Sequence, residues 1–188
     1  GTFVAKISGA KTPSNGTYGN CMLVDDNYLY LLSFNGSFIY CQKISLSSNT
    51  SVLSTTVTVS SSYMNAYSPN AVQDTNYIYT GIYKIAKSTL TLSLTAPVAV
   101  KQNGTLRDKN GRIICIKSNT TTSFVITVYN ASDLTVIKSI TITMPVTMSA
   151  VDGTEFKGYT IDKDDNIIIE YLETGGTKTH IAKLARDN

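Results

Sequence analysis

The sequence predicts an all-β fold made of four repeated units, each with up to four short antiparallel strands. First, the composition favours strands over helices, because 26 of the 188 residues are Thr and 12 are Tyr, whereas only three are Glu. Second, turn residues such as Gly, Asn and Ser recur at short intervals. Third, one motif, an Asp- and Asn-rich turn followed by a β-branched or aromatic run, occurs four times.

Each copy of the motif has an apolar residue, an Asp/Asn turn and then a strand. The copies begin at Leu23, Val72, Leu106 and Ile161. Asp and Asn tolerate the left-handed backbone conformation and hydrogen-bond their own backbone, which suits them to tight hairpins. The motif therefore predicts the turn between the first and second strands of each unit.

Further strands follow each hairpin. The predicted third strands are Phe38–Ile44, Ile82–Ile85, Phe124–Tyr129 and His180–Leu184. The predicted fourth strands are Val52–Val59, Leu90–Val100 and Thr135–Thr143. The last unit has no fourth strand, and an additional strand, Thr2–Ser8, precedes the first unit. Because an unpaired sheet edge promotes aggregation, we expect Phe3 to Ser8 to complete the last unit and close a ring.

This layout resembles that of the β-propeller superfamily, over nearly the whole chain. The equivalent turn asparagines are Asn27, Asn76, Asn110 and Asn166. Their spacings of 49, 34 and 56 residues average close to the period of roughly 40–50 residues of four-stranded blades. The chain has no Trp, so the Trp-Asp dipeptide of WD repeats is absent, and no particular family is indicated.

The resemblance implies a single domain over residues 1–188, a small β-propeller of about four four-stranded blades closed by the N-terminal strand. A fragment of a larger propeller and a β-sandwich are the alternatives. Propellers serve as binding platforms as often as enzymes, with ligands over the central channel.

The charge pattern argues against nucleic acid as a partner. The net charge is +3, and the 16 Lys and Arg residues are scattered singly rather than gathered on one stretch. The chain also lacks an apolar run of the roughly 18 to 20 residues that a membrane-spanning helix needs, so no membrane insertion is expected.

No catalytic constellation stands out. His180 is the only histidine and lies in a predicted strand, without a nucleophile motif nearby. A glycoside hydrolase needs two carboxylates, for which Asp162, Asp164, Glu170 and Glu173 are the candidates. The turn motif already accounts for the aspartates, so we expect no catalytic residue and a non-enzymatic protein.

We expect neither a metal nor a cofactor. The turn that starts at Asp162 matches the first positions of a calcium loop, and Glu173 falls at its twelfth position. However, an isoleucine replaces the required glycine, and β-branched residues follow. Cys21, Cys41 and Cys115 lack zinc-ligand spacing and are expected to be buried thiols, with a Cys21–Cys41 disulfide as the alternative if their strands pair.

The tyrosines supply the candidate ligand-binding residues. Eight of the twelve lie between Tyr28 and Tyr83. Tyr28 and Tyr30 share one face of a predicted strand, and Tyr77 and Tyr79 occupy the equivalent positions of the next unit. Exposed tyrosines bind sugars and proteins through a rigid ring with a hydroxyl group, whereas buried ones pack between sheets.

These features together predict a non-enzymatic binding or structural module. The composition, poor in charge and rich in Ser, Thr, Asn and Tyr, is typical of virion-surface and extracellular adhesion or receptor-binding domains, including those of phage tails. The expected partner is a glycan or protein receptor, within a larger assembly. The alternatives are a carbohydrate-active propeller enzyme that uses carboxylates on the channel face, and an intracellular protein-interaction scaffold.

Overall fold

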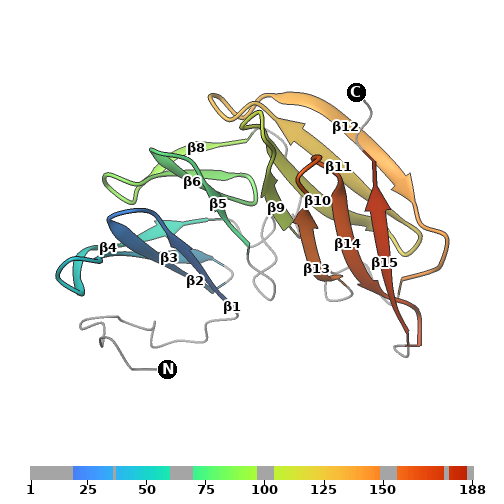
Figure 1. Ribbon diagram of the computed structural model, residues 1–188, viewed down its shortest axis with the longest axis horizontal. Coiled ribbons are helices and arrows are strands. Elements are labelled where there is room, and N and C mark those ends of the chain that lie inside the picture. Colours follow the sequence, from blue (N-terminus) through green and yellow to red (C-terminus); the bar gives the residue numbers. More distant parts are fainter. Residues whose placement is uncertain are drawn as a thin grey trace.

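A computed structural model describes residues 19–35, 37–59, 70–96, 104–148, 156–175 and 178–185 of the chain. In this part of the chain, the strands form four antiparallel sheets, which are the blades of a small β-propeller (Figure 1). The all-β class and the propeller architecture predicted from the repeats are therefore confirmed. Within the same residues, no helix is long and apolar enough to cross a membrane.

Strands that are neighbours in the chain are also neighbours in each blade. Blade 1 contains β1 (Gly19–Val24), β2 (Tyr28–Phe34), β3 (Phe38–Ser45) and β4 (Thr50–Thr58). Blade 2 contains β5 (Val72–Gln73), β6 (Tyr77–Thr80), β7 (Tyr83–Ala86) and β8 (Leu92–Thr95). Blade 3 contains β9 (Gly104–Arg107), β10 (Ile113–Thr120), β11 (Ser123–Tyr129) and β12 (Val136–Thr143). Blade 4 contains β13 (Phe156–Ile161), β14 (Ile167–Leu172) and β15 (Thr179–Leu184).

The turn between the third and fourth strands has the same backbone in three blades. Asn49, Leu90 and Leu134 each adopt a left-handed conformation, with φ of 55°, 55° and 56°. The prediction of a strand from Leu90 was therefore wrong at its start, because Leu90 ends the turn and β8 begins only at Leu92. The last residues of that predicted strand, 97–100, lie outside the described residues.

Blade 4 has three strands among the described residues. Its predicted completion by Phe3 to Ser8 concerns residues that lie outside the described part of the chain. The predicted ring closure by this strand therefore stays a prediction.

Two hydrophobic clusters connect the blades. One joins blades 1 and 2 to one face of blade 3, and the other joins the opposite face of blade 3 to blade 4. The run Ile113–Ile116 in β10 explains the division, because its alternate side chains enter different clusters. A strand buried on both faces requires such a continuous apolar run, and each large side chain buried contributes roughly 1.5–3 kcal/mol.

Strands β9 and β13 approach each other closely at Gly104 of β9. A Cβ atom added at Gly104 would lie 2.6 Å from ring atoms of Tyr159 in β13, so only glycine fits there without displacement of the ring. Nearby, the hydroxyl oxygen of Thr105 accepts a hydrogen bond from the backbone N–H of Gly81, with a distance of 2.7 Å. These contacts tie blades 2, 3 and 4 together near the middle of the molecule.

The three cysteines are free thiols. Cys21 and Cys41 both pair with Leu32, from opposite sides of β2, so their strands do not pair with each other. Two strand spacings amount to roughly 9–10 Å, which exceeds the separation that a disulfide spans. Burial raises the pKa of Cys41 and of Cys115 to about 12.

Candidate ligand-binding groove

The first aspartate of each motif copy organises its own turn. In blades 1 and 2, Oδ1 of Asp25 and of Asp74 accepts hydrogen bonds from the backbone N–H groups two and three residues later, over 2.7–3.1 Å. These hydrogen bonds fix the start of the next strand, whose first residue is Tyr28 in blade 1 and Tyr77 in blade 2. The repeated Asp thus positions a repeated Tyr.

The second carboxylate oxygen of each aspartate binds a side chain. Asp25 Oδ2 lies 3.0 Å from Nζ of Lys87, which belongs to blade 2, so this ion pair links two blades. Asp74 Oδ2 accepts a hydrogen bond of 2.7 Å from the hydroxyl of Tyr79. Although burial acts to raise it, these hydrogen bonds and those from the backbone lower the pKa of both carboxyls.

The corresponding turns of blades 3 and 4 are two residues longer but use the same chemistry. Asp108 Oδ2 pairs with Nε of Arg112 at 2.6 Å, and Asp162 Oδ2 pairs with Nζ of Lys183 at 2.9 Å. Hydrogen bonds from Asn166 and Lys183 hold the pKa of Asp162 well below its usual range. Asp162, one of the carboxylates considered for catalysis, is thus a turn acceptor.

The other carboxylates considered for catalysis are Asp164, Glu170 and Glu173, and Glu170 lies within β14. Asp164 pairs with the neighbouring Lys163 at 3.0 Å on an exposed part of the turn. Glu173 pairs with Nε2 of His180 at 3.0 Å, beside β15. In the described part of the chain, no group of three or more His, Cys, Asp or Glu side chains is arranged to hold a metal ion.

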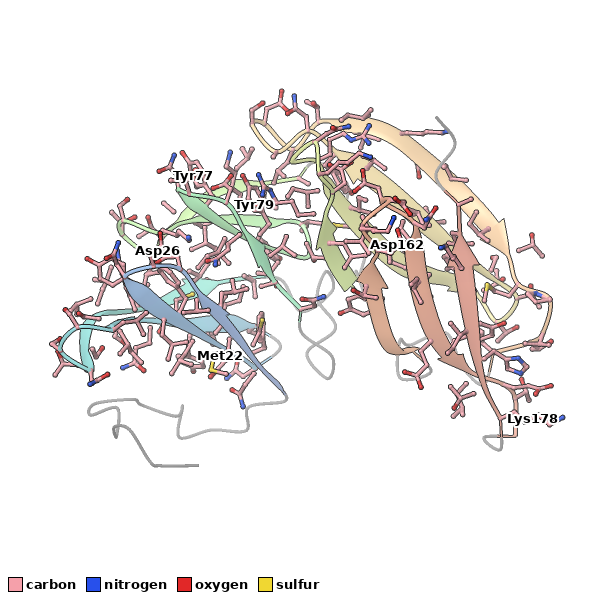
Figure 2. All side chains as sticks on the ribbon, viewed as in Figure 1. Met22, Asp26, Tyr77, Tyr79, Asp162 and Lys178 are labelled. Carbon is pink, nitrogen blue, oxygen red and sulfur yellow. The ribbon has the colours of Figure 1, made fainter. Side chains whose placement is uncertain are left out.

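A groove of about 830 Å³ runs between blades 1 and 2 at these turns and reaches Arg107, at the end of β9 in blade 3. Figure 2 labels Asp26 and Tyr77, which come from the turn of blade 1 and the start of β6 in blade 2 and which both line the groove. Its other lining residues are Asp25, Asn27, Tyr28, Tyr30, Lys43, Gln73, Asp74, Thr75, Asn76, Ala86, Lys87, Ser88 and Arg107.

Three of the four tyrosines singled out from the sequence line this groove. Tyr28 and Tyr77 are half-buried, whereas Tyr30 is only 2% exposed. Tyr79 is not among the lining residues: it is 1% exposed, and its hydroxyl also donates to the carbonyl oxygen of Ala131 in blade 3, over 3.3 Å. As predicted, the tyrosines of each pair share a face, with ring centroids 6.4 Å apart in both pairs.

Tyr28 and Tyr77, the first residues of β2 and β6, are the outer tyrosines of the two pairs. A lysine from the neighbouring strand lies over each of their rings. Nζ of Lys43 lies 3.9 Å from the ring centroid of Tyr28, and Nζ of Lys84 lies 4.1 Å from that of Tyr77. Such cation–π contacts contribute roughly 0.5–2 kcal/mol and restrict the orientation of the ring. Each outer tyrosine is therefore held in place where it borders the groove.

The two lysines also reach the next blade, but to different extents. Lys84 is 5% exposed and donates to the carbonyl oxygens of Ala131 and Ser132 in blade 3, over 2.8 and 2.7 Å. Lys43 is half-buried and makes one longer contact of 3.4 Å, to the carbonyl oxygen of Lys87 in blade 2. Lys84 is thus a structural cation, and Lys43 remains partly accessible.

The sequence did not point to these lysines. Lys43 pairs with Tyr30 and Lys84 pairs with Tyr79 in the strand register. Their equivalence is hidden in the sequence because the hairpin between the paired residues is longer in blade 1 than in blade 2. Alignment of the two hairpins from their strand ends, rather than from the Asp turns, would have revealed it.

No model of a known protein family matches the chain, and no curated protein does. Among solved structures, the chain is similar to the hydrazine synthase of Kuenenia stuttgartiensis, with a TM-score of 0.46. The identity is 10%, over 98% of this chain and 70% of that chain.

Proposed function

We propose that this propeller is a non-enzymatic binding module of the virion-surface or extracellular adhesion type, and that the groove between blades 1 and 2 binds a glycan. The observation that carries this proposal is the pair of half-buried tyrosines, Tyr28 and Tyr77, at equivalent positions of adjacent blades on one groove. Tyrosine gives a glycan both a flat apolar ring and a hydroxyl group, at a small cost in conformational entropy.

The remaining lining favours recognition over acid–base chemistry. Asp25 and Asp74 are the inner carboxylates of the groove, and both are already hydrogen-bonded by backbone N–H groups and side chains. A general acid needs a carboxyl with a raised pKa, whereas these two have lowered pKa values. The exposed Asn27, Thr75 and Asn76 supply neutral hydrogen-bonding groups instead.

A glycan array probed with the whole chain tests the proposal, followed by calorimetry with the glycans that bind. Tyr28→Ala and Tyr77→Ala are expected to weaken binding at least about tenfold, equivalent to about 1.4 kcal/mol. Tyr40→Ala is the matched control, because Tyr40 is also half-buried in blade 1 but does not line the groove.

Binding that Tyr40→Ala weakens as much as the groove variants would place the site elsewhere. Failure of every glycan class to bind would reject glycan recognition. Release of reducing sugar during the calorimetric experiment would favour the alternative of a carbohydrate-active enzyme.

A further inference from the structure

The groove between blades 1 and 2 has no excess of either charge. Its charged side chains are three cations and three carboxylates, namely Lys43, Lys87, Arg107, Asp25, Asp26 and Asp74. The Lys87–Asp25 ion pair neutralises one of each. Arg107, although it forms no ion pair in the described part of the chain, is close enough to Asp74 to lower the pKa of that carboxyl. A balanced lining does not attract a ligand through its net charge.

Neutral hydrogen-bonding groups remain available for a ligand. Asn27, Thr75 and Asn76 are exposed at the turns. Gln73 donates from Nε2 to the carbonyl oxygen of Val24 over 2.6 Å, whereas its Oε1 is buried and has no hydrogen-bond partner among the described residues. A buried acceptor without a donor is costly, but this oxygen is closed to solvent, so the exposed side chains are the groups that a ligand reaches.

The dimensions of the groove indicate more than one sugar ring. Its volume of about 830 Å³ lies near the upper end of the roughly 300–1,000 Å³ typical of sites for drug-sized ligands. The aromatic surface is also divided between two blades, because Tyr28 and Tyr77 each have their own lysine and their own Asp turn. The groove therefore offers two separate ring surfaces, one from each blade.

We infer that the ligand is a neutral oligosaccharide that spans the two blades, with one sugar ring against Tyr28 and another against Tyr77. This inference rests on the proposed function and specifies its ligand class. Two linked contacts raise the affinity far above that of either alone, since the second contact forms within the complex.

The test compares neutral hexose oligosaccharides of one to four units with uronate-containing oligosaccharides of the same lengths, by calorimetry on the whole chain. The affinity for the neutral series is expected to rise at least about tenfold between one and four units. It is also expected to stay constant between roughly 0.05 and 0.5 M NaCl, because screening acts only on charged partners.

Two variants locate the two ring contacts. Tyr28→Ala and Tyr77→Ala are each expected to reduce the affinity for the four-unit sugar at least about tenfold, and the affinity for the single hexose about twofold at most. Tyr28→Phe and Tyr77→Phe keep the ring and are expected to retain the length dependence, which serves as a control for folding.

Two results would overturn the inference while the proposed function stands. One is a preference for uronates that weakens with salt, and the other is an affinity that does not depend on the length of a neutral sugar. The absence of binding to both series and to the array would instead reject the proposed function itself.

Discussion

Blades 1 and 2 have the same repeated backbone as blades 3 and 4 but carry different side chains at equivalent positions. In the second and third strands, blades 1 and 2 pair Tyr30 with Lys43 and Tyr79 with Lys84. At the equivalent positions, blade 3 pairs Ile114 with Val128 and blade 4 pairs Ile168 with Lys183, so the tyrosine is absent from both. Between blades 1 and 2 this lining surrounds a polar, aromatic groove of about 830 Å³.

Between blades 3 and 4 the space is smaller and mostly aliphatic. A groove of about 200 Å³ lies there, and its lining includes Ile114, Val128, Ile140 and Ile142. The Asp turns of blades 3 and 4 are nevertheless connected by an aspartate: Asp165 Oδ1 in blade 4 accepts a hydrogen bond of 3.0 Å from the backbone N–H of Lys109 in blade 3. The comparison shows that the Asp turns maintain the frame, while a few strand positions decide whether an inter-blade space suits a polar ligand.

The largest effect is expected at the close contact between blades 3 and 4. Gly104→Ala puts a methyl group where ring atoms of Tyr159 would lie 2.6 Å away, so the ring must move. We expect a loss of about 2 kcal/mol in the free energy of unfolding, measured by urea denaturation. In a Tyr159→Ala background the same substitution should cost much less, and equal costs in both backgrounds would show that the contact is not the cause.

The next largest effect distinguishes the two lysines. Lys84→Met removes the donor of two carbonyl oxygens in blade 3 and should lower the free energy of unfolding by about 1 to 2 kcal/mol. Both substitutions remove a cation–π contact, but Lys43→Met removes only one hydrogen bond, of 3.4 Å, and should cost about 1 kcal/mol less than Lys84→Met. Equal losses in urea denaturation would contradict the distinction between a structural lysine in blade 2 and an accessible one in blade 1.

The smallest effect concerns acid stability. Although burial acts to raise it, the hydroxyl of Tyr79 and two backbone N–H groups lower the pKa of Asp74 in the folded state. The carboxylate therefore stabilises the fold above the unfolded pKa of roughly 4, and this contribution is lost as the pH falls through the folded pKa. Asp74→Asn should flatten the fall in unfolding free energy between about pH 4 and pH 2, measured by urea denaturation, and parallel curves for the two proteins would exclude this role.

Part of the candidate site was predictable because it depends on local chemistry. An Asp followed by Asn and a Tyr-rich strand forms its hydrogen bonds within a few residues, so Tyr28 and Tyr77 could be placed at strand starts from the sequence alone. The shared face of Tyr30 and Tyr28 followed from the period of two in a strand. The roles of Gln73 and Lys43 were not predictable, since their partners come from other strands or another blade.

By itself, the sequence determined most of the described strands, the Asp turns, the fourfold repeat and hence the propeller, because hydrogen bonding and side-chain alternation act over short distances along the chain. Only the tertiary structure decided which tyrosines border a groove: Tyr30 and Tyr79 hold equivalent positions, yet Tyr30 lines the groove while Tyr79 binds a carbonyl oxygen of blade 3. The physical reason is that the side chains on the face of a strand pack against the neighbouring blade, and the residues of that blade are distant in sequence.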